Sequence, residues 1–251
     1  KRLNRPAAWA GIVAAGRQYR RRLIGIEPDP ALPSHSVSGA VAWQVEACLL
    51  GRMTNILLIN GHQPFPTSPG KLNAALTAFA ADFFAARDCP VRCVETKSAW
   101  DLETEIGNQL WAGLIIVQFP LNSMGLPWSL KRYFDEVYTA GMDGRLAKGD
   151  GRSRSDPGRQ YGSGGRMQDT RYMLSVTSNA PQTAFGDARQ TLFSGRSIDD
   201  LLSPVHINFA FFGASACPTF AAYDVSKGGR TAEDFRRYEY HLLAVYDLLG
   251  A

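Results

Sequence analysis

The residues best suited to bind an anion are Ser68, Gly70, Lys71, Leu72 and Asn73. They combine a hydroxyl group and a lysine charge with backbone N–H groups at the expected start of a helix. There Thr67 or Ser68 would act as the cap, and Pro69 would take the first helical position. Unpaired N–H groups and the positive end of a helix dipole attract phosphate. The segment therefore predicts a phosphate site on a helix that begins near Pro69.

An apolar run at residues 55–60 precedes this segment and carries no alternation of polar and apolar positions. Such a run is typical of a strand that helices cover on both faces. Open α/β sheets bind ligands at the carboxyl ends of their strands. We therefore expect the loop after this strand to carry the phosphate site.

Strand-like and helix-like stretches alternate from Met53 onward. We expect further strands at 91–95, 114–120, 171–178 and within 211–222, and helices at about 69–88, 99–111, 128–139 and 231–249. Residues 140–170 have no periodicity and are rich in Gly, Arg and Ser, so they predict one long loop, functional or disordered. Five strands alternating with helices predict a doubly wound parallel α/β sheet with helices on both faces.

Two doubly wound folds compete for this pattern. A Rossmann domain needs G-x-G-x-x-G at the first turn, and this turn has only Gly61 and Gly70. The long, hydroxyl-rich turn instead resembles the phosphate loop of a flavodoxin-like fold, whose five-stranded sheet has the order 2-1-3-4-5.

Charge and cysteine content exclude several other classes. The net charge of +4 arises in residues 1–52, which hold eight Lys/Arg against three Asp/Glu, so the rest is close to neutral and nucleic-acid binding is not expected. Cys48, Cys89, Cys93 and Cys217 lack zinc-site spacing, so we expect reduced thiols and no metal. These features favour a cytoplasmic protein.

Residues 1–52 form an N-terminal extension that we expect to lie outside the fold. The apolar stretch 6–16 is too short to span a bilayer, and its arginines follow it instead of preceding it as in a secretory signal. The extension is either an Arg-rich targeting or surface segment, or lies upstream of a true start at Met53. We favour the second interpretation, with one flavodoxin-like domain at 53–251.

Four segments in order carry a specific resemblance: NILLINGHQPFPTSPGKLN, QFPLNSMGLPWSLKRYFDEVYT, DGRSRSDPGRQYGSGG and YMLSVTSNAP. Together they resemble the flavodoxin-like NAD(P)H:quinone oxidoreductases, in particular the bacterial modulator of drug activity B type. The resemblance runs from Met53 to the end of the chain. It implies FAD as the cofactor, with FMN the less favoured flavin, NADPH or NADH as co-substrate, and a homodimer in which both chains line each flavin.

The resemblance also assigns the cofactor-binding residues. It implies that the phosphate segment Ser68–Asn73 holds the FAD pyrophosphate and that two further strand ends meet the flavin. These strand ends are Pro120, Leu121, Asn122 and Ser123, and Thr177, Ser178, Asn179 and Ala180. Similar bacterial proteins often carry Trp where Ser123 and Ser178 stand, which implies a wider or more polar substrate pocket here.

Tyr161 and Gly162, in the stretch GRQYGSGG, match the family tyrosine beside the flavin. A phenol hydroxyl or glycine N–H groups can stabilise the negative charge that develops on a reduced flavin. We therefore expect Tyr161 to be catalytic, although composition alone favours a surface loop. Arg152, Arg154 and Arg159 either recognise a 2′-phosphate or are solvated loop charges, and His206 is expected to be a packing residue.

The function implied is two-electron transfer from NAD(P)H through FAD to a quinone by a ping-pong mechanism, without stable membrane insertion. The alternatives are an FMN-dependent azo- or nitroreductase, a flavodoxin-like electron carrier, or an ancillary subunit of a transporter. Carriers of this fold are usually short and strongly acidic, whereas residues 53–251 are near neutral and contain the long loop. The aromatic stretch Phe209–Phe212 is a candidate dimer surface.

Overall fold

The computed structural model describes residues 54–250, so the predictions for residues 1–52 and for a start at Met53 lie outside the described part. Its centre is a parallel sheet of order β2-β1-β3-β4-β5, with β6 also paired to β4. The strands are β1 (Ile56–Asn60), β2 (Val91–Glu95), β3 (Leu114–Pro120), β4 (Arg171–Thr177), β5 (Ser215–Ala216) and β6 (Phe220–Ala222). This confirms the predicted flavodoxin-like fold and strand order.

Continuous burial explains the continuous apolar runs of the two central strands. Every residue of β1 and β3 is buried, and the pairs Ile56–Leu114 and Asn60–Gln118 mark the two ends of their parallel register. Strands packed between two helical layers have no solvent-facing side, so an alternating pattern would place polar groups in a core.

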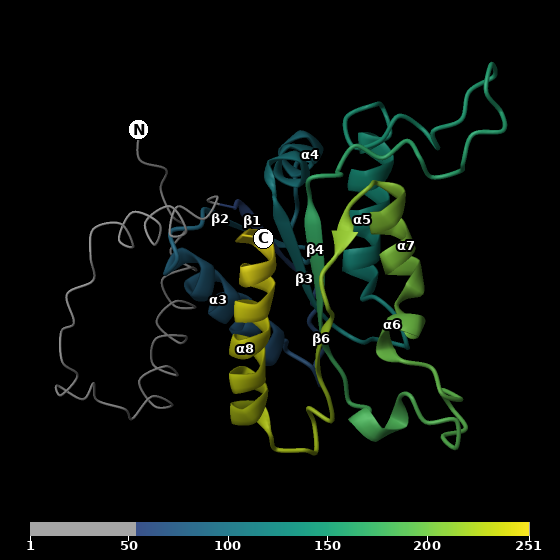
Figure 1. Ribbon diagram of the computed structural model, residues 1–251. Coiled ribbons are helices and arrows are strands. Elements are labelled where there is room, and N and C mark those ends of the chain that lie inside the picture. The colour runs from purple at the N-terminus through teal and green to yellow at the C-terminus, as the bar shows by residue number, and fades with distance from the viewer. Residues whose placement is uncertain (1–53, 251) are drawn as a thin grey trace, which may run out of the picture.

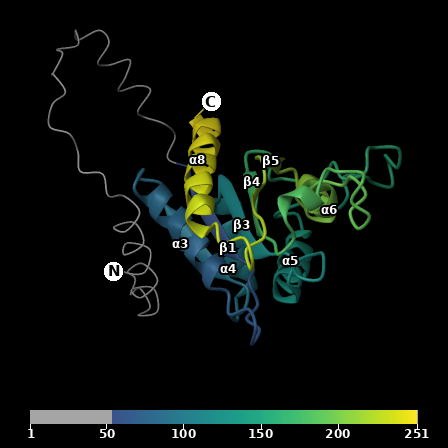
Figure 2. The same ribbon diagram turned by 90° about the horizontal axis from the view of Figure 1, so that it is seen from below.

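Helices cover both faces of the sheet (Figure 1). One face carries α3 (Lys71–Ala85) and α8 (Thr231–Gly250), and the other carries α4 (Leu102–Trp111), α5 (Trp128–Gly141) and α7 (Ser203–Phe211). Figure 2 shows the same three layers from below. A short 3-10 helix η1 (Gln182–Ala184) and α6 (Ile198–Leu201) connect β4 to α7. Within residues 54–250, no helix has the length and apolar character needed to cross a bilayer.

The region 198–222 differs from the expectation of a single fifth strand. Phe211 ends helix α7, and the strand is divided into β5 and β6 around Cys217, Pro218 and Thr219. Pro218 lacks an N–H group and so interrupts the ladder. The run FAFF belongs to a helix because a short apolar run does not distinguish a buried helix from a buried strand.

Residues 142–170 form the expected long loop, and it lies at the amino ends of the strands (Figure 1). The N–H group of Arg171 bonds the carbonyl of Gly113 at 2.9 Å, and the Thr170 hydroxyl bonds the carbonyl of Ala112 at 3.1 Å. Because Ala112 and Gly113 immediately precede β3, the end of this loop is fixed opposite the carboxyl edge of the sheet.

The aromatic stretch 209–212 is mostly core and not surface. Phe209 and Phe212 are buried, and Phe209 stacks on Tyr172 with 4.1 Å between ring centroids. Helical spacing turns both rings toward the sheet. The expectation of a Phe-rich dimer surface is therefore wrong for these two residues, and of the three phenylalanines in the stretch Phe211 alone is half-buried and reaches the outside.

Candidate functional site

Three loops meet at the carboxyl edge of the sheet, and backbone hydrogen bonds hold the chain together there. The N–H group of Gly61 bonds the carbonyl of Gln118, and that of Leu121 bonds the carbonyl of Thr177, both at 2.8 Å. The predicted segments Ser68–Asn73, Pro120–Ser123 and Thr177–Ala180 follow β1, β3 and β4 at this edge. The structure therefore brings the predicted cofactor-binding residues together, except those of the long loop.

Helix α3 presents an open amino terminus at this edge. It begins at Lys71, Gly70 is the N-cap residue with a φ of 81°, and no side chain caps it within the described part of the chain. The helix therefore begins close to the predicted start, but the predicted hydroxyl cap and first-position Pro69 are wrong, since Gly70 is the N-cap residue. Ser68 instead closes a tight turn with Phe65 through two backbone bonds of 2.9 and 3.0 Å. The first backbone N–H groups of α3 and the Ser68 hydroxyl are thus available to an anion.

A chain of buried polar side chains connects α3 to the two strands beneath it. Gln118 donates from Nε2 to Oδ1 of Asn73 at 2.8 Å and accepts from the Ser175 hydroxyl at 2.6 Å. The Thr177 hydroxyl donates to the same Asn73 oxygen at 3.3 Å. All four residues are buried. Because buried polar groups are costly without partners, this chain fixes the first turn of α3 on β3 and β4.

The same bonds fix the orientation of the Asn73 amide. Its oxygen accepts two hydrogen bonds, so its Nδ2 group is left as a donor, with no acceptor for it in the part of the chain that the structure describes. Sequence reasoning selected Asn73 but missed Gln118 and Ser175. The available signal was the polar residue Gln118 within an otherwise apolar strand.

His62 is a further buried residue of this edge that the sequence did not single out. It is 4% exposed, and its ring lies on Gly70, where a built Cβ would fall 2.3 Å from Nδ1. Burial lowers the pKa of His62, Lys97 acts in the same direction, and a hydrogen bond to the Ser68 backbone opposes them. Among described residues its Nε2 atom has no partner. An uncharged imidazole therefore lies directly against the N-cap residue of α3.

The loop after β3 is a tight turn in an uncommon backbone conformation. Asn122 and Gly125 exchange two backbone bonds of 3.0 and 2.8 Å, and the intervening Ser123 and Met124 have φ values of 47° and 64°. Left-handed backbone at residues other than glycine costs free energy and is concentrated at ligand sites. Ser123 and Met124 are exposed and so border open space next to the edge.

The loop after β4 is held by side-chain hydrogen bonds of Ser178 and Asn179. Ser178 is 2% exposed, and its hydroxyl accepts a hydrogen bond from the Ala180 N–H group at 3.1 Å. Asn179 is exposed and accepts a hydrogen bond from the Ser226 hydroxyl at 2.5 Å. Of the two serines expected to widen the pocket, only Ser123 faces open space.

Tyr161 and Gly162 lie at the other end of the molecule. Tyr161 is 66% exposed and packs on Phe211 with 5.7 Å between ring centroids, and Gly162 bonds the Asp150 carbonyl at 2.9 Å. From its first to its last residue β4 rises by roughly 20 Å, at about 3.3 Å a residue. Within one chain, Tyr161 is therefore far from the α3 amino terminus.

Arg152, in the same loop, pairs with Asp150 at 2.6 Å and lies 5.4 Å from the centroid of the Tyr161 ring. Arg154 and Arg159 are exposed. His206 accepts or donates a 2.8 Å bond with the Tyr172 hydroxyl and lies 3.2 Å from the Asp199 carboxylate. Because Tyr172 is near the start of β4, His206 is also remote from the carboxyl edge.

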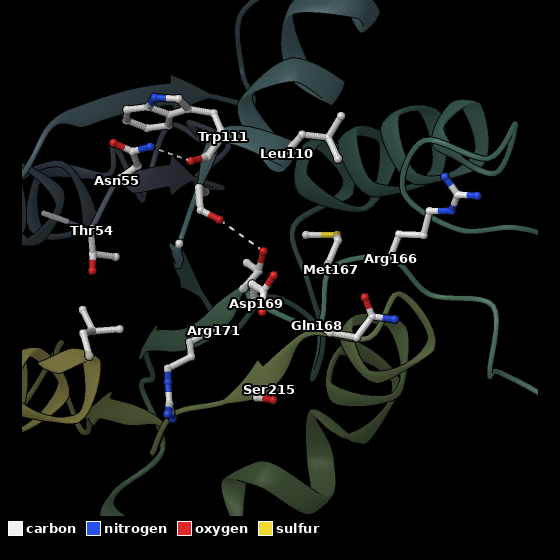
Figure 3. A pocket seen from close by; sticks show the side chains of 14 residues that line it. Thr54, Asn55, Leu110, Trp111, Arg166, Met167, Gln168, Asp169, Arg171 and Ser215 are labelled. Carbon is white, nitrogen blue, oxygen red and sulfur yellow. Dashed lines mark hydrogen bonds between the residues drawn. The ribbon is translucent and has the colours of Figure 1, made fainter. Parts of the chain in front are cut away.

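A cavity of about 680 Å³ also lies at the amino ends of the strands (Figure 3). Some polar groups that line this cavity already have hydrogen-bond partners within the protein. Nδ2 of Asn55 donates to the Trp111 carbonyl at 2.9 Å, and the Thr170 hydroxyl donates to the Ala112 carbonyl. Arg166 and Arg171 point away from one another in Figure 3 and form no common anion site. Ligands of open α/β sheets bind at carboxyl ends, so we place the candidate site at the other edge despite the size of this cavity.

Comparison with known proteins identifies a family and relatives that share this fold. Residues 54–244 match a family model described as a flavodoxin-like fold. An uncharacterised protein of Schizosaccharomyces pombe is 41% identical over 196 residues, which cover 78% of this chain and 99% of that protein. The NADPH:quinone oxidoreductase MdaB of Haemophilus influenzae is 37% identical over 195 residues, which cover 76% of this chain and 99% of the relative.

Solved structures share the fold. A putative quinone reductase from Klebsiella pneumoniae superposes with a TM-score of 0.63 at 23% identity, covering 76% of this chain and 85% of that one. General stress protein 14 from Treponema denticola, in complex with FMN, superposes with a TM-score of 0.52 at 19% identity, covering 78% and 99%. By its family match and its relatives, the chain belongs to the flavodoxin-like NAD(P)H:quinone oxidoreductase family, whose members are flavin-dependent oxidoreductases.

Proposed function

We propose that this protein is a flavin-dependent NAD(P)H:quinone oxidoreductase. The observation that carries the proposal is the open amino terminus of α3 beside a fixed Asn73 amide, in a chain 37% identical to an NADPH:quinone oxidoreductase. When bound, the flavin would accept a hydride from NAD(P)H and pass two electrons to a quinone, each substrate using the same open face in turn. FAD is the proposed flavin, and FMN, present in the Treponema structure, is the alternative.

The residues at the edge fit the phosphate of either flavin. Gly70 takes the left-handed conformation that leaves the following N–H groups facing outward, and the exposed Lys71 adds a positive charge. The Ser68 hydroxyl and Nδ2 of Asn73 supply further donors. These groups would bind and orient the cofactor, while Pro120–Ser123 and Thr177–Ala180 would border its ring.

In this proposal, residues of the turn after β3 determine which electron acceptor the site binds. Exposed Ser123, Met124 and Trp128 lie at the mouth of the site, so they would contact whichever acceptor enters. A serine at position 123 leaves more room than an aromatic residue. We therefore propose a small planar quinone as the acceptor, with space for substituents on this side.

We also propose a homodimer in which the partner chain supplies Tyr161. The distance of Tyr161 from the carboxyl edge of its own chain supports this arrangement, because a tyrosine that contacts the flavin must then come from another copy. Exposed Tyr161 and Ile207 and half-buried Phe211 give that surface apolar area. In the dimer, the Tyr161 hydroxyl would donate a hydrogen bond to negative charge on the reduced ring.

The experiment that tests the proposed function is two-substrate steady-state kinetics with the purified protein. NADPH and menadione are varied together, and parallel lines in double-reciprocal plots are the expected result for substrates that use one slot in turn. The alternative acceptor classes, azo dyes and nitroaromatics, are assayed alongside. Turnover with an azo dye but not with menadione would replace the quinone proposal by an azoreductase.

A further inference from the structure

The long loop contains a projecting arm, residues 152–161, in which every residue is exposed. Figure 1 shows the long loop extending from the amino end of the sheet, away from the rest of the molecule. Backbone hydrogen bonds pair the two segments at the base of the arm. The N–H group of Arg166 bonds the Leu146 carbonyl at 2.9 Å, and that of Lys148 bonds the Gly164 carbonyl at 2.8 Å. The base therefore holds the arm in a defined position although its side chains are exposed.

The base and the tip of the arm both have fixed backbone geometry. The two base segments approach closely because they contain glycine, since a built Cβ on Gly164 would lie 2.5 Å from the Gly149 carbonyl oxygen. At the tip, Ser153 and Asp156 exchange two backbone bonds of 3.3 and 3.2 Å. The Ser153 hydroxyl accepts a further bond from the Asp156 N–H group at 3.0 Å. Arg154 lies within this turn, so the backbone on both sides of it is held.

Two cationic side chains of the arm have no partner in their own chain. Arg152 is paired with Asp150 at 2.6 Å. Arg154 and Arg159, in contrast, form no ion pair and no side-chain hydrogen bond within residues 54–250. A guanidinium group can bind two phosphate oxygens at once. The arm therefore presents two free groups that are suited to an anionic ligand.

We propose that Arg154 and Arg159 bind the 2′-phosphate of NADPH at the flavin site of the partner chain. This inference rests on the proposed function and on the proposed dimer, in which Tyr161 contacts the partner's flavin. Arg159 is two residues from Tyr161, so their Cα atoms are at most about 7 Å apart. Because the nicotinamide must reach the flavin, a tyrosine beside the flavin brings the arm to the region where the rest of the nucleotide lies.

The chemistry of the ligand follows from the charge that has to be bound. The 2′-phosphate carries about two negative charges near pH 7, and it is the group that distinguishes NADPH from NADH. Hydrogen bonds between a guanidinium group and a phosphate are charge-assisted and therefore strong. Two such groups on one arm favour NADPH over NADH.

The carboxyl edge of the same chain offers few free cations for this phosphate. Lys71 is assigned to the flavin phosphate, and Lys97 and Arg189 pair with carboxylates of their own chain at 3.1 and 2.9 Å. Lys227 follows β6 at this edge and is exposed, with no ion pair among the described residues. Its ammonium group is a point charge and cannot bind two oxygens as a guanidinium does. Arginines of the partner's arm would supply the recognition that this edge lacks.

The test is anaerobic stopped-flow reduction of the flavin-loaded protein by NADPH and, separately, by NADH. The loss of flavin absorption gives a second-order rate constant for each nucleotide, so the result does not depend on the acceptor. The double variant Arg154→Gln/Arg159→Gln removes both charges at exposed positions. Lys227→Gln is the matched control, because it removes an exposed, unpaired cation from the chain's own edge.

We expect the wild type to react faster with NADPH than with NADH. The double variant should lose roughly tenfold in the rate constant for NADPH, about the value of one hydrogen bond to a charged group, and keep the rate constant for NADH. Lys227→Gln should keep the wild-type ratio of the two rate constants. A wild-type ratio in the double variant, no preference in the wild type, or a loss in Lys227→Gln instead would overturn the inference while flavin reduction remains. A flavin that neither nucleotide reduces would refute the proposed function.

A mixed dimer tests whether the arm acts on the partner's site. One chain carries Gly70→Ala, which impairs its own flavin site, together with the natural arm. The other chain carries Arg154→Gln/Arg159→Gln and an intact flavin site. A wild-type preference for NADPH in this mixed dimer supports binding by the partner's arm, and the reduced preference of the double variant would contradict it.

Discussion

Position 70 requires glycine for two reasons: its backbone is left-handed, and the buried ring of His62 lies against it. Gly70→Ala would cost about 1–2 kcal/mol for the backbone alone and would displace His62. We expect the variant to unfold at lower urea concentration and to purify with less flavin per chain. Both quantities are read from urea unfolding and from the absorbance of released flavin.

Gly107, in the middle of α4, is the matched control because a Cβ there meets nothing within 4 Å. Gly107→Ala should stabilise the protein by roughly 0.5–1 kcal/mol and leave flavin content unchanged. If both substitutions lowered flavin content equally, the special role of Gly70 would be wrong.

Two histidines give the flavin-free protein a defined response to acid. Burial lowers the pKa values of His62 and His241 in the folded state, so the unfolded chain binds more protons below about pH 6.5. Their contribution to the free energy of unfolding therefore falls as the pH drops through the unfolded value. Urea unfolding at a series of pH values should show a flatter dependence of stability on pH for the double variant His62→Gln/His241→Gln. An unchanged pH dependence would contradict the lowered pKa values of the two histidines.

At the scale of elements, the hydrogen bonds of Gln118 join α3 to β3 and β4. Gln118→Leu removes both side-chain bonds and leaves Asn73 and Ser175 with one partner fewer, which costs about 1–3 kcal/mol. Because the Asn73 amide then keeps only the longer bond from the Thr177 hydroxyl, at 3.3 Å, we expect its orientation to loosen and flavin affinity to fall as well. Fluorescence titration of flavin measures this loss.

Gln109 supplies a control of the same type in the opposite layer. It is fully buried and bonds the Tyr133 and Tyr138 hydroxyls, both at 3.1 Å. Gln109→Leu should lose comparable stability without weakening flavin binding. Equal loss of flavin in both variants would show that Gln118 acts through stability alone.

Uninterrupted apolar runs predicted β1 and β3 well, since both strands are buried on two faces. The sequence did not identify features that depend on a contact with another part of the chain. The burial of His62 depends on its packing against Gly70, eight positions later. Helix α7 was not predicted, because the apolar run FAFF fits a strand as well as a helix. The capping box formed by Ser197 and Asp200 was a usable local signal for the helices before residue 211.

The sequence predicted better which edge of the sheet these segments reach than how each segment folds locally. The sequence correctly indicated that the phosphate segment follows the first strand. The helix was predicted to begin at Pro69 because the turn between Phe65 and Ser68 cannot be recognised from composition. Tyr161 could not be positioned either, since a loop without periodicity gives no information about which end of the sheet it contacts.

At the scale of the whole molecule, supply of Tyr161 by a partner predicts complementation between inactive chains. Tyr161→Ala and Gly70→Ala would each impair turnover as homodimers. Co-expressed with different affinity tags, they should form mixed dimers in which one of the two sites has intact residues from both chains. Recovered quinone reductase activity is expected after tandem purification.

Tyr161 acting within its own chain would leave every mixed dimer without an intact site, and no activity would return. Light scattering of the wild type accompanies this experiment, and a monomer with full activity would also contradict the dimer proposal.

The central claim, a flavin at the carboxyl edge that exchanges electrons with both NADPH and a quinone, is tested most directly by an anaerobic titration. The purified protein is denatured in one portion to identify its flavin, and NADPH is added to the other while visible absorption is followed. We predict bound FAD whose absorption is lost on addition of NADPH and restored by menadione. A colourless protein that does not bind added FAD or FMN, or a flavin that NADPH leaves unchanged, would contradict the account.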